Sequence, residues 1–340
     1  MSSPADPKAV AAWLRSQGIE VATPLHADQI AGGRSNLTYR LTDAHGATWV
    51  LRRPPTGHVL ATAHDMGREW RFISAFHPTA VPVPEPVALC EDEEVLGAPF
   101  YVMGYVDGVV VADHERARSL PEDSRSVLSY DLVHVLAELH AVEVDAAGIG
   151  TIGPRDDYVA RQLRRWNKQW EATYEQAGLQ DIRASELHAK LAAAAPPQER
   201  TAVVHGDYRL GNVLTSPEGR VLAVLDWELA ALGPRELDLA WLIHSHRLYE
   251  DLGTRAGRTS TMPNFLRAAD VSTTYESLTG HSPRDLDFYL TYSALIFAVV
   301  LLRAGVRRVH FGEQPPPREV DDLVLNREPL QRMMADDYWT

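Results

Sequence analysis

Alternating apolar and polar positions predict a small β-sheet in the first third of the chain. The segment 37–41 alternates, and a turn over 43–46 leads into the segment 48–51, as in a β-hairpin. Two further strands are predicted at 87–90 and 99–105. Together these segments indicate a β-rich amino-terminal part.

Helices and turns separate those strands. The spacing of apolar residues predicts short helices over 8–18 and 66–76. The proline-rich stretch 81–86 cannot form a regular helix, because proline has no backbone N–H donor. The acidic stretch 91–97 is predicted to be a turn between two strands.

Downstream of Gly108 the pattern becomes mainly helical. Helices are predicted over 124–142, 158–176 and 184–195. The first of them has a single apolar face, formed by Val127, Leu128, Leu132, Val135, Leu136 and Leu139.

Three short apolar segments interrupt these helices. The segments 202–204, 213–214 and 221–225 predict one strand–turn–strand unit. Nearly everything after Glu236 is predicted to be helical, including a long apolar helix over 286–304.

The order of these elements predicts an α+β fold with two lobes. A small β-rich lobe would comprise residues 1–105, and a larger, mainly helical lobe would comprise residues 106–340. The connection near residue 105 is short and apolar, so the lobes are expected to pack around a cleft, which is a common place for ligands.

Composition narrows the class of partner. The 340 residues include 33 basic and 46 acidic ones, for a formal charge of −13, so nucleic acid is not expected as a partner. The single cysteine, Cys90, allows no intramolecular disulfide and no cysteine-based metal cluster. Residues 1–7 lack an apolar signal core, and the stretch 289–304 is too short and interrupted to span a bilayer. We therefore expect a cytoplasmic protein without a membrane partner.

The strongest chemical signal is the segment His-Gly-Asp-Tyr-Arg-Leu-Gly-Asn over 205–212. Asp207 can accept the proton of a hydroxyl group, and Asn212 can offer its side-chain oxygen to a metal ion. The H-x-D-x-x-x-x-N spacing matches that of a kinase catalytic loop. Taken alone, Asp207 could equally cap a turn, since aspartate and asparagine are common there.

A second signal lies at Asp226, which directly follows the apolar segment 221–225. Asp226-Trp227-Glu228 sits where protein kinases carry Asp-Phe-Gly. Asn212 and Asp226 together offer the oxygen ligands that Mg²⁺ prefers. The two signals in this order favour a magnesium-dependent phosphoryl-transfer site over a simple turn.

Three segments together resemble the aminoglycoside phosphotransferase family, whose members have a protein-kinase-like fold. They read H-G-D-Y-R-L-G-N-V-L from His205, V-L-D-W-E-L-A from Val224 and G-P-R-E-L-D-L-A-W-L from Gly233. The likeness is closer to the branch related to the kinase-like domains fused to some acyl-CoA dehydrogenases. It extends from about Ile30 to about Gly305.

This resemblance implies transfer of the γ-phosphate of ATP onto a hydroxyl group of a small molecule. Asp207 would be the catalytic base or would orient the acceptor hydroxyl, and Arg209 would lie near the γ-phosphate. Asn212 and Asp226 would hold Mg²⁺, with Glu228 as a supporting contact to metal or water. Two further residues would brace the loop by hydrogen bonds: His205 and Asp238.

The resemblance also implies nucleotide contacts from the first lobe. A phosphate-covering turn would be formed by Gly32, Gly33, Ser35 and Asn36, although two glycines alone also suit an ordinary hairpin turn. Arg52 stands where the wider family has a phosphate-binding lysine, and Arg53 would replace it if the register slipped by one. Glu69 matches the helix glutamate that pairs with this basic residue, or is a solvated helix charge.

The segment 100–108 resembles the strand that borders the adenine ring. Backbone groups at Gly104 and Val106 would bind adenine, and Met103 would line the pocket beside them. Backbone recognition leaves almost no side-chain signature, and a methionine such as Met103, taken alone, is more often a core residue.

The acceptor is expected over the helical lobe. Aminoglycoside sites are usually acidic, whereas the stretch 158–170 carries the basic residues Arg161, Arg164, Arg165 and Lys168. Such a helix suits an anionic acceptor or a coenzyme A phosphate, or is simply a solvated face.

Three functions stay open from the sequence. We prefer a kinase of a small hydroxylated metabolite, with a hydroxyacyl-CoA as one candidate. The alternatives are an aminoglycoside kinase that confers drug resistance and a nucleotide-binding pseudokinase. Arg52, in place of the usual lysine, favours the pseudokinase, whereas the complete set of Asp207, Asn212 and Asp226 argues against it. The sequence does not fix the oligomeric state, since the tail 311–340 either covers the helical lobe or mediates dimer contacts.

Overall fold

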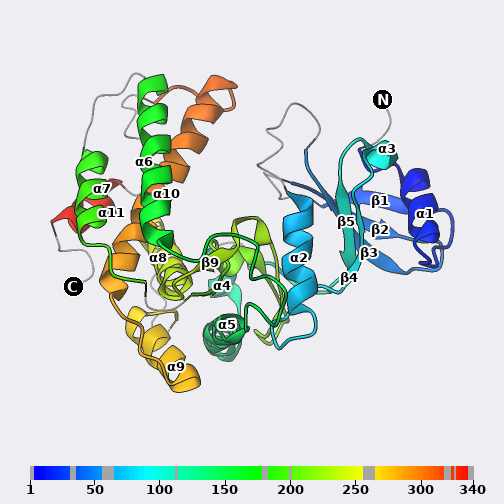
Figure 1. Ribbon diagram of the computed structural model, residues 1–340, viewed down its shortest axis with the longest axis horizontal. Coiled ribbons are helices and arrows are strands. Elements are labelled where there is room, and N and C mark those ends of the chain that lie inside the picture. Colours follow the sequence, from blue (N-terminus) through cyan, green and yellow to red (C-terminus); the bar gives the residue numbers. More distant parts are fainter. Residues whose placement is uncertain are drawn as a thin grey trace.

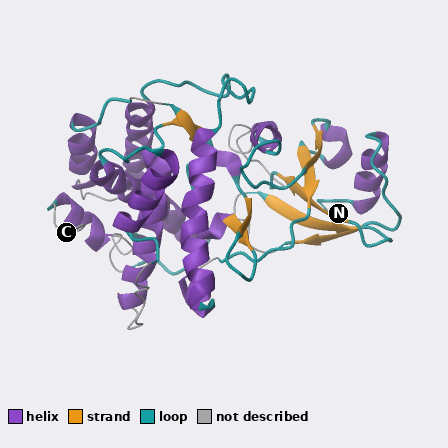
Figure 2. Cartoon of the chain, turned by 90° about the horizontal axis from the view of Figure 1, so that it is seen from below, coloured by secondary structure: helices purple, strands orange, loops and turns teal. Residues whose placement is uncertain are grey.

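Two lobes that differ in secondary structure lie side by side (Figure 1). The computed structural model describes residues 4–30, 36–55, 65–111, 114–177, 183–198, 201–255, 265–317, 323–324 and 327–335. The smaller lobe is a β-sheet flanked by helices, and the larger lobe is mainly helical (Figure 2). The predicted bilobal α+β fold is therefore confirmed.

The sheet of the smaller lobe has five strands, all antiparallel to their neighbours. They are β1 (His26–Gln29), β2 (Leu37–Thr42), β3 (Thr48–Arg53), β4 (Pro86–Cys90) and β5 (Phe100–Gly104), in the order β1-β2-β3-β5-β4. Strands β2 and β3 form the predicted hairpin, with Leu37 opposite Arg53. Strand β1 was not predicted, because this edge strand is mostly polar and exposed.

Three helices accompany this sheet: α1 (Pro7–Ser16), α2 (Met66–Phe76) and α3 (Glu93–Leu96). The prediction of a simple turn over 91–97 was wrong, because the Asp92 side chain caps a short helix that ends at the left-handed Gly97. Helix α2 begins at an Asp65 cap, whose side chain accepts from the Arg68 N–H at 2.9 Å. It stands between the sheet and the larger lobe (Figure 1).

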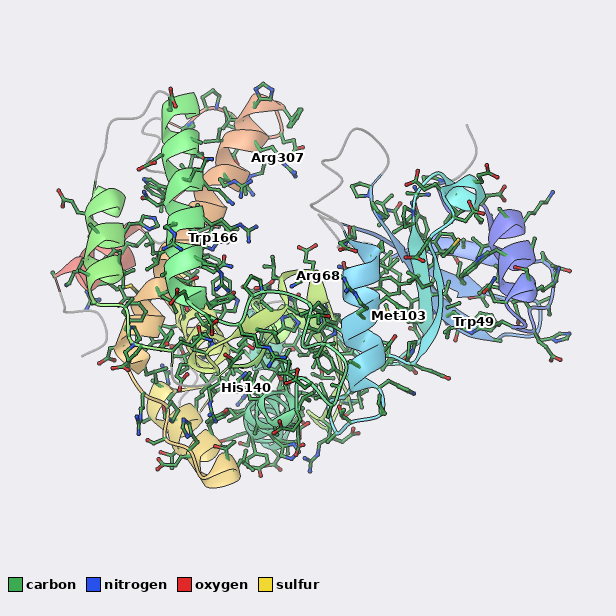
Figure 3. All side chains as sticks on the ribbon, in the orientation of Figure 1. Trp49, Arg68, Met103, His140, Trp166 and Arg307 are labelled. Carbon is green, nitrogen blue, oxygen red and sulfur yellow. The ribbon has the colours of Figure 1, made fainter. Side chains whose placement is uncertain are left out.

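The two lobes share an apolar contact and a polar one along α2. Phe76 lies 4.6 Å from Trp227 of the larger lobe, measured between ring centroids, and Phe72 stacks on the same indole. Arg68 points from α2 towards the larger lobe (Figure 3) and donates to the carbonyls of Ile152 and Ala230, both at 2.7 Å. The lobes are therefore joined by packing as well as by the chain connection.

The larger lobe contains the remaining helices. They are α4 (His114–Ser119), α5 (Glu122–Ala141), α6 (Tyr158–Ala177), α7 (Arg183–Ala193), α8 (Glu236–Arg255), α9 (Ala268–Thr279), α10 (Leu286–His310) and α11 (Arg327–Met334). Helix α10 has 25 residues, more than predicted, and by length and composition it could cross a membrane. However, 61% of the most apolar 18-residue stretch of α10 is buried within the protein, as is usual for a helix of a protein core.

Four short strands lie among these helices: β6 (Ala202–Val204), β7 (Val213–Thr215), β8 (Val221–Val224) and β9 (Ala231–Gly233). The predicted single strand–turn–strand unit was wrong, because β6 pairs with β9 and only β7 and β8 form a hairpin. Strand β9 was missed because three small and apolar residues show no periodicity. These two ribbons hold the loop over 205–212 between them.

Candidate active site

The loop over 205–212 leaves β6, passes a 3₁₀ turn at Leu210–Asn212 and enters β7. Gly206 adopts a left-handed φ of 82°, and a Cβ atom built there would lie 2.8 Å from the Leu229 carbonyl oxygen. Only glycine fits this position without a shift of the neighbouring backbone. The loop is thereby held tightly against the turn that follows Asp226.

Three donors fix the direction of the Asp207 carboxylate. The Trp241 indole N–H donates to Oδ1 at 2.7 Å, the Arg209 Nε donates to Oδ1 at 3.1 Å, and the Asn212 amide donates to Oδ2 at 2.7 Å. The Asp207 side chain keeps 22% of its surface exposed. It is therefore an oriented carboxylate that a ligand can still reach.

A buried carboxylate, Asp238 of α8, holds the backbone of the loop. It accepts from the His205 N–H at 2.6 Å and from the Gly206 N–H at 2.9 Å. The His140 ring lies 3.4 Å from Asp238 and 3.0 Å from the Tyr275 hydroxyl. Asp238 thus satisfies two backbone donors that would otherwise be buried without a partner, which is the bracing role that the resemblance implies.

Asp226 lies next to this loop, at the end of β8. The Leu225 N–H donates to the Asn212 carbonyl at 2.8 Å, and Asp226 itself has a left-handed φ of 67°. Glu69, Asp226 and Glu228 can each place one oxygen within 4.8 Å of the others. Such a group of carboxylate oxygens suits a hard divalent cation such as Mg²⁺. Glu69 joins the predicted ligands here, whereas the Asn212 amide nitrogen is engaged with Asp207.

Arg52 connects the two lobes at this point. Its Nε lies 2.8 Å from Glu69 Oε2, and its Nη2 lies 2.5 Å from Asp226 Oδ1. Burial disfavours its charge, yet the neighbouring Tyr101, Glu69 and Asp226 raise the pKa of Arg52 above its usual value. Arg53 points elsewhere and donates to the Leu96 carbonyl at 3.0 Å, so the predicted register at Arg52 holds.

Glu69 is held by further donors. The Tyr101 hydroxyl donates to Oε2 at 3.0 Å, and the Asn36 amide donates to Oε1 at 2.9 Å. Burial raises the pKa of Glu69, while the Arg52 charge opposes that rise. Asn36, predicted in a phosphate-covering turn, thus contacts this glutamate. The other members of that predicted turn lie outside the described residues: Gly32, Gly33 and Ser35.

The predicted adenine-binding segment follows β5. Met103 is buried and packs in the core opposite Val50 of β3. The Gly104 N–H donates to the Glu85 carbonyl at 2.8 Å and is therefore not left for a ligand. Within the described part of the chain, the Val106 N–H has no hydrogen-bond partner. One backbone donor, the Val106 N–H, is therefore available here.

Trp241 is a functional candidate that the sequence reasoning missed. Its indole N–H holds the Asp207 carboxylate. A usable signal was present, because Asp238 and Trp241 are three residues apart and lie on the same face of a helix. If one of them contacts the loop, the other is expected to do so as well.

Comparisons with known proteins identify the family and the fold. Residues 26–281 match the model of a family described as the phosphotransferase enzyme family. The acyl-CoA dehydrogenase family member 10 of Mus musculus is 40% identical over 231 residues, which is 66% of this chain and 21% of that protein. The chain spans about a fifth to a third of the length of the curated relatives it matches.

Solved structures show the same fold over the whole chain. A candidate aminoglycoside phosphotransferase from Ralstonia eutropha is 32% identical, with a TM-score of 0.75 and 97% of each chain covered. A complex of an aminoglycoside phosphotransferase with GDP and kanamycin is 16% identical, with a TM-score of 0.61 and 97% and 98% of the two chains covered. This second likeness concerns the fold alone.

Proposed function

Because the chain belongs to the phosphotransferase enzyme family, we propose that it transfers the γ-phosphoryl group of ATP onto a hydroxyl group of a small molecule. The observation that carries this proposal is the meeting of Asp207, Asn212 and Asp226 in one place, beside Arg52 of the other lobe. A catalytic base and oxygen ligands for a cation are the parts that phosphoryl transfer needs.

In this proposal Asp207 orients the acceptor hydroxyl and accepts its proton. Phosphoryl transfer requires little covalent work from the protein, so the fixed direction of this carboxylate is its main contribution. Asn212, Asp226 and Glu228 would hold Mg²⁺ with Glu69 close by, and the ion would neutralise charge on the phosphate oxygens.

The cationic and backbone groups would bind the nucleotide. Arg52 can contact phosphate oxygens with two parallel donors, which a lysine cannot do. Arg209, next to Asp207, would lie near the γ-phosphate. The Gly104 carbonyl and the Val106 N–H would bind the adenine edge, with Met103 behind them, and the turn containing Gly32, Gly33 and Ser35 would cover the phosphates.

We further propose that the acceptor is a small hydroxylated metabolite such as a hydroxyacyl-CoA. Support comes from the relatives whose names place them among the acyl-CoA dehydrogenases and from the basic residues of α6. An aminoglycoside kinase is the second candidate, favoured by the name of the Ralstonia eutropha structure. A pseudokinase would have no chemical need for the oriented Asp207.

A turnover screen tests these proposals. Purified protein with ATP and Mg²⁺ is assayed for ADP release against hydroxyacyl-CoAs, amino sugars and amino alcohols, with thermal shift recorded in parallel. We expect hydroxyacyl-CoA to be phosphorylated. Turnover with kanamycin-type drugs alone would contradict the metabolite proposal, and a thermal shift with ATP but no turnover on any acceptor would favour the pseudokinase.

Trp241 is expected to act as a positioning residue in this reaction. Trp241→Phe keeps an aromatic ring against Phe297 but removes the N–H that holds Asp207, so we expect kcat to fall about tenfold with the KM for ATP unchanged. Trp13→Phe on α1 is the matched control. Equal kcat values in both variants, or a loss explained by a lower Tm, would contradict the role.

A further inference from the structure

Two helices of the larger lobe carry stripes of basic residues on adjoining faces. On α6, Arg161, Arg164, Arg165 and Lys168 have the i, i+3, i+4, i+7 spacing of one helix face. On α10, Arg303, Arg307 and His310 have a similar spacing. We call these seven residues the basic wall.

The two stripes are in contact with each other. Arg303 of α10 donates to the Gln169 side chain of α6. Burial and then the nearby charge of Arg165 lower the pKa of Arg303, which places two arginines close together across the helix pair. The basic wall is therefore one continuous surface and not two separate patches.

Within the described residues, the arginines and the lysine of the basic wall lack acidic partners. Among the residues that the structure describes, no carboxylate lies within ion-pair distance of any of them. Three pairs of like-charged residues stand four positions apart on these helices, an arrangement that destabilises helices. They are Arg161 with Arg165, Arg164 with Lys168, and Arg303 with Arg307. In a chain with a net charge of −13, this repulsion is not a general property of the surface. Like-charged neighbours that destabilise a helix are expected mainly where they serve a function such as binding.

The basic wall starts beside the catalytic loop. Tyr158, the first residue of α6, packs against Gly233 of β9, where an added Cβ atom would lie 3.1 Å from its ring. Burial and then Asp238 raise the pKa of Tyr158 to about 12, whereas Arg165 and Arg161 lower it. The Tyr158 hydroxyl is thus close enough to feel the charge of Asp238, which holds the loop, and the charges of Arg161 and Arg165 of the basic wall.

Helix α10 gives the distance scale. Phe297 lies 5.9 Å from Trp241 between ring centroids, and Trp241 contacts Asp207. Arg303 and Arg307 follow Phe297 by six and ten residues, so they lie about 9 and 15 Å further along the helix. Trp166 and Arg307 lie on the side of these helices that is turned towards the smaller lobe (Figure 3).

We propose that the basic wall binds a phosphate-bearing part of the acceptor, remote from the hydroxyl group that reaches Asp207. The inference rests on the proposed function, and it adds that the acceptor is an elongated anion whose charged end lies about 9 to 15 Å beyond Phe297 along α10, remote from the reacting group. Such remote binding positions the reacting end without taking part in the chemistry.

Binding of sodium tripolyphosphate tests the basic wall without any need for catalysis. Calorimetry compares the wild type with R165Q/R303Q/R307Q and with K8Q/R116Q/R118Q, which removes the same charge from exposed positions on α1 and α4. We expect the first variant to weaken binding about tenfold and the control less than about twofold, and added salt to weaken wild-type binding. Equal affinities of the two triple variants, or no binding by the wild type, would overturn the proposal.

Kinetics with an acceptor found in the turnover screen gives the second measurement. R165Q/R303Q/R307Q is expected to raise the KM for the acceptor about tenfold, with kcat and the KM for ATP unchanged. Arg307→Gln alone should give a smaller rise of the same kind, which guards against misfolding of the triple variant. Tighter binding of duplex DNA or phosphatidylserine vesicles than of tripolyphosphate, at equal phosphate concentration, would assign the surface to a macromolecule and overturn the proposal. Because tripolyphosphate binding needs no turnover, failure of the kinase proposal and failure of this one are distinguishable.

Discussion

Asp207→Ala is expected to lower phosphoryl transfer by about a thousandfold while the fold persists. The carboxylate is aimed by Trp241, Arg209 and Asn212, so its removal takes away both the proton acceptor and the group that orients the hydroxyl. The side chain is 22% exposed, so water can reach the donors that lose their partner. The free energy of unfolding should therefore fall by only about 1–2 kcal/mol.

The measurement is ADP release with the acceptor found in the turnover screen, together with a thermal melt. Asp145→Ala is the matched control, because Asp145 is an exposed aspartate that forms an ion pair with Arg155, away from the loop. Turnover of Asp207→Ala within about threefold of this control would rule out Asp207 as the base. A melt without a cooperative transition would show that the loss comes from unfolding.

Asp226→Asn is the second change with a large expected effect, about a hundredfold or more in kcat. Asparagine removes the charge of a proposed Mg²⁺ ligand but keeps its shape. It also tolerates the left-handed backbone at Asp226, whose φ is 67°, better than alanine does. Arg52 keeps its contact with Glu69, so the junction of the lobes should survive.

Kinetics over a range of Mg²⁺ concentrations test this prediction. We expect Asp226→Asn to need more Mg²⁺ for half-maximal turnover as well as to turn over slowly. Asp285→Asn provides the control, since Asp285 also has a left-handed φ, of 51°, but precedes α10. An unchanged Mg²⁺ requirement in Asp226→Asn would remove Asp226 from the proposed metal site.

The central part of the site could be predicted because its residues are close in sequence. Asp207 and Asn212 belong to one loop, and Asp226 follows after a single hairpin, so local spacing already implies that they meet. Arg52 could be placed because the strand resembles the one that carries a phosphate-binding lysine in the wider family, and Arg53 points away. The exposed edge strand β1 left no such pattern.

Other parts of the site depend on contacts that spacing does not encode. Glu69 reaches Asp226 only because α2 packs against the larger lobe through Phe76 and Trp227. Arg165 and Arg303 become neighbours through the packing of α6 on α10, which tertiary structure alone decides. The basic character of α6 was visible in the sequence, but its continuation on α10 was not.

Helix α8 holds the loop over 205–212 at two points. Asp238 holds the backbone of the loop, and Trp241, one turn later, holds the side chain that acts in it. Asp238 and Trp241 both belong to α8, so they move together with the helical lobe. Any movement of the smaller lobe would therefore carry Arg52 past a stationary Asp207. In the proposed reaction, the acceptor would meet the same alignment of Asp207 at every position of the smaller lobe, and only the approach of the phosphate donor would vary.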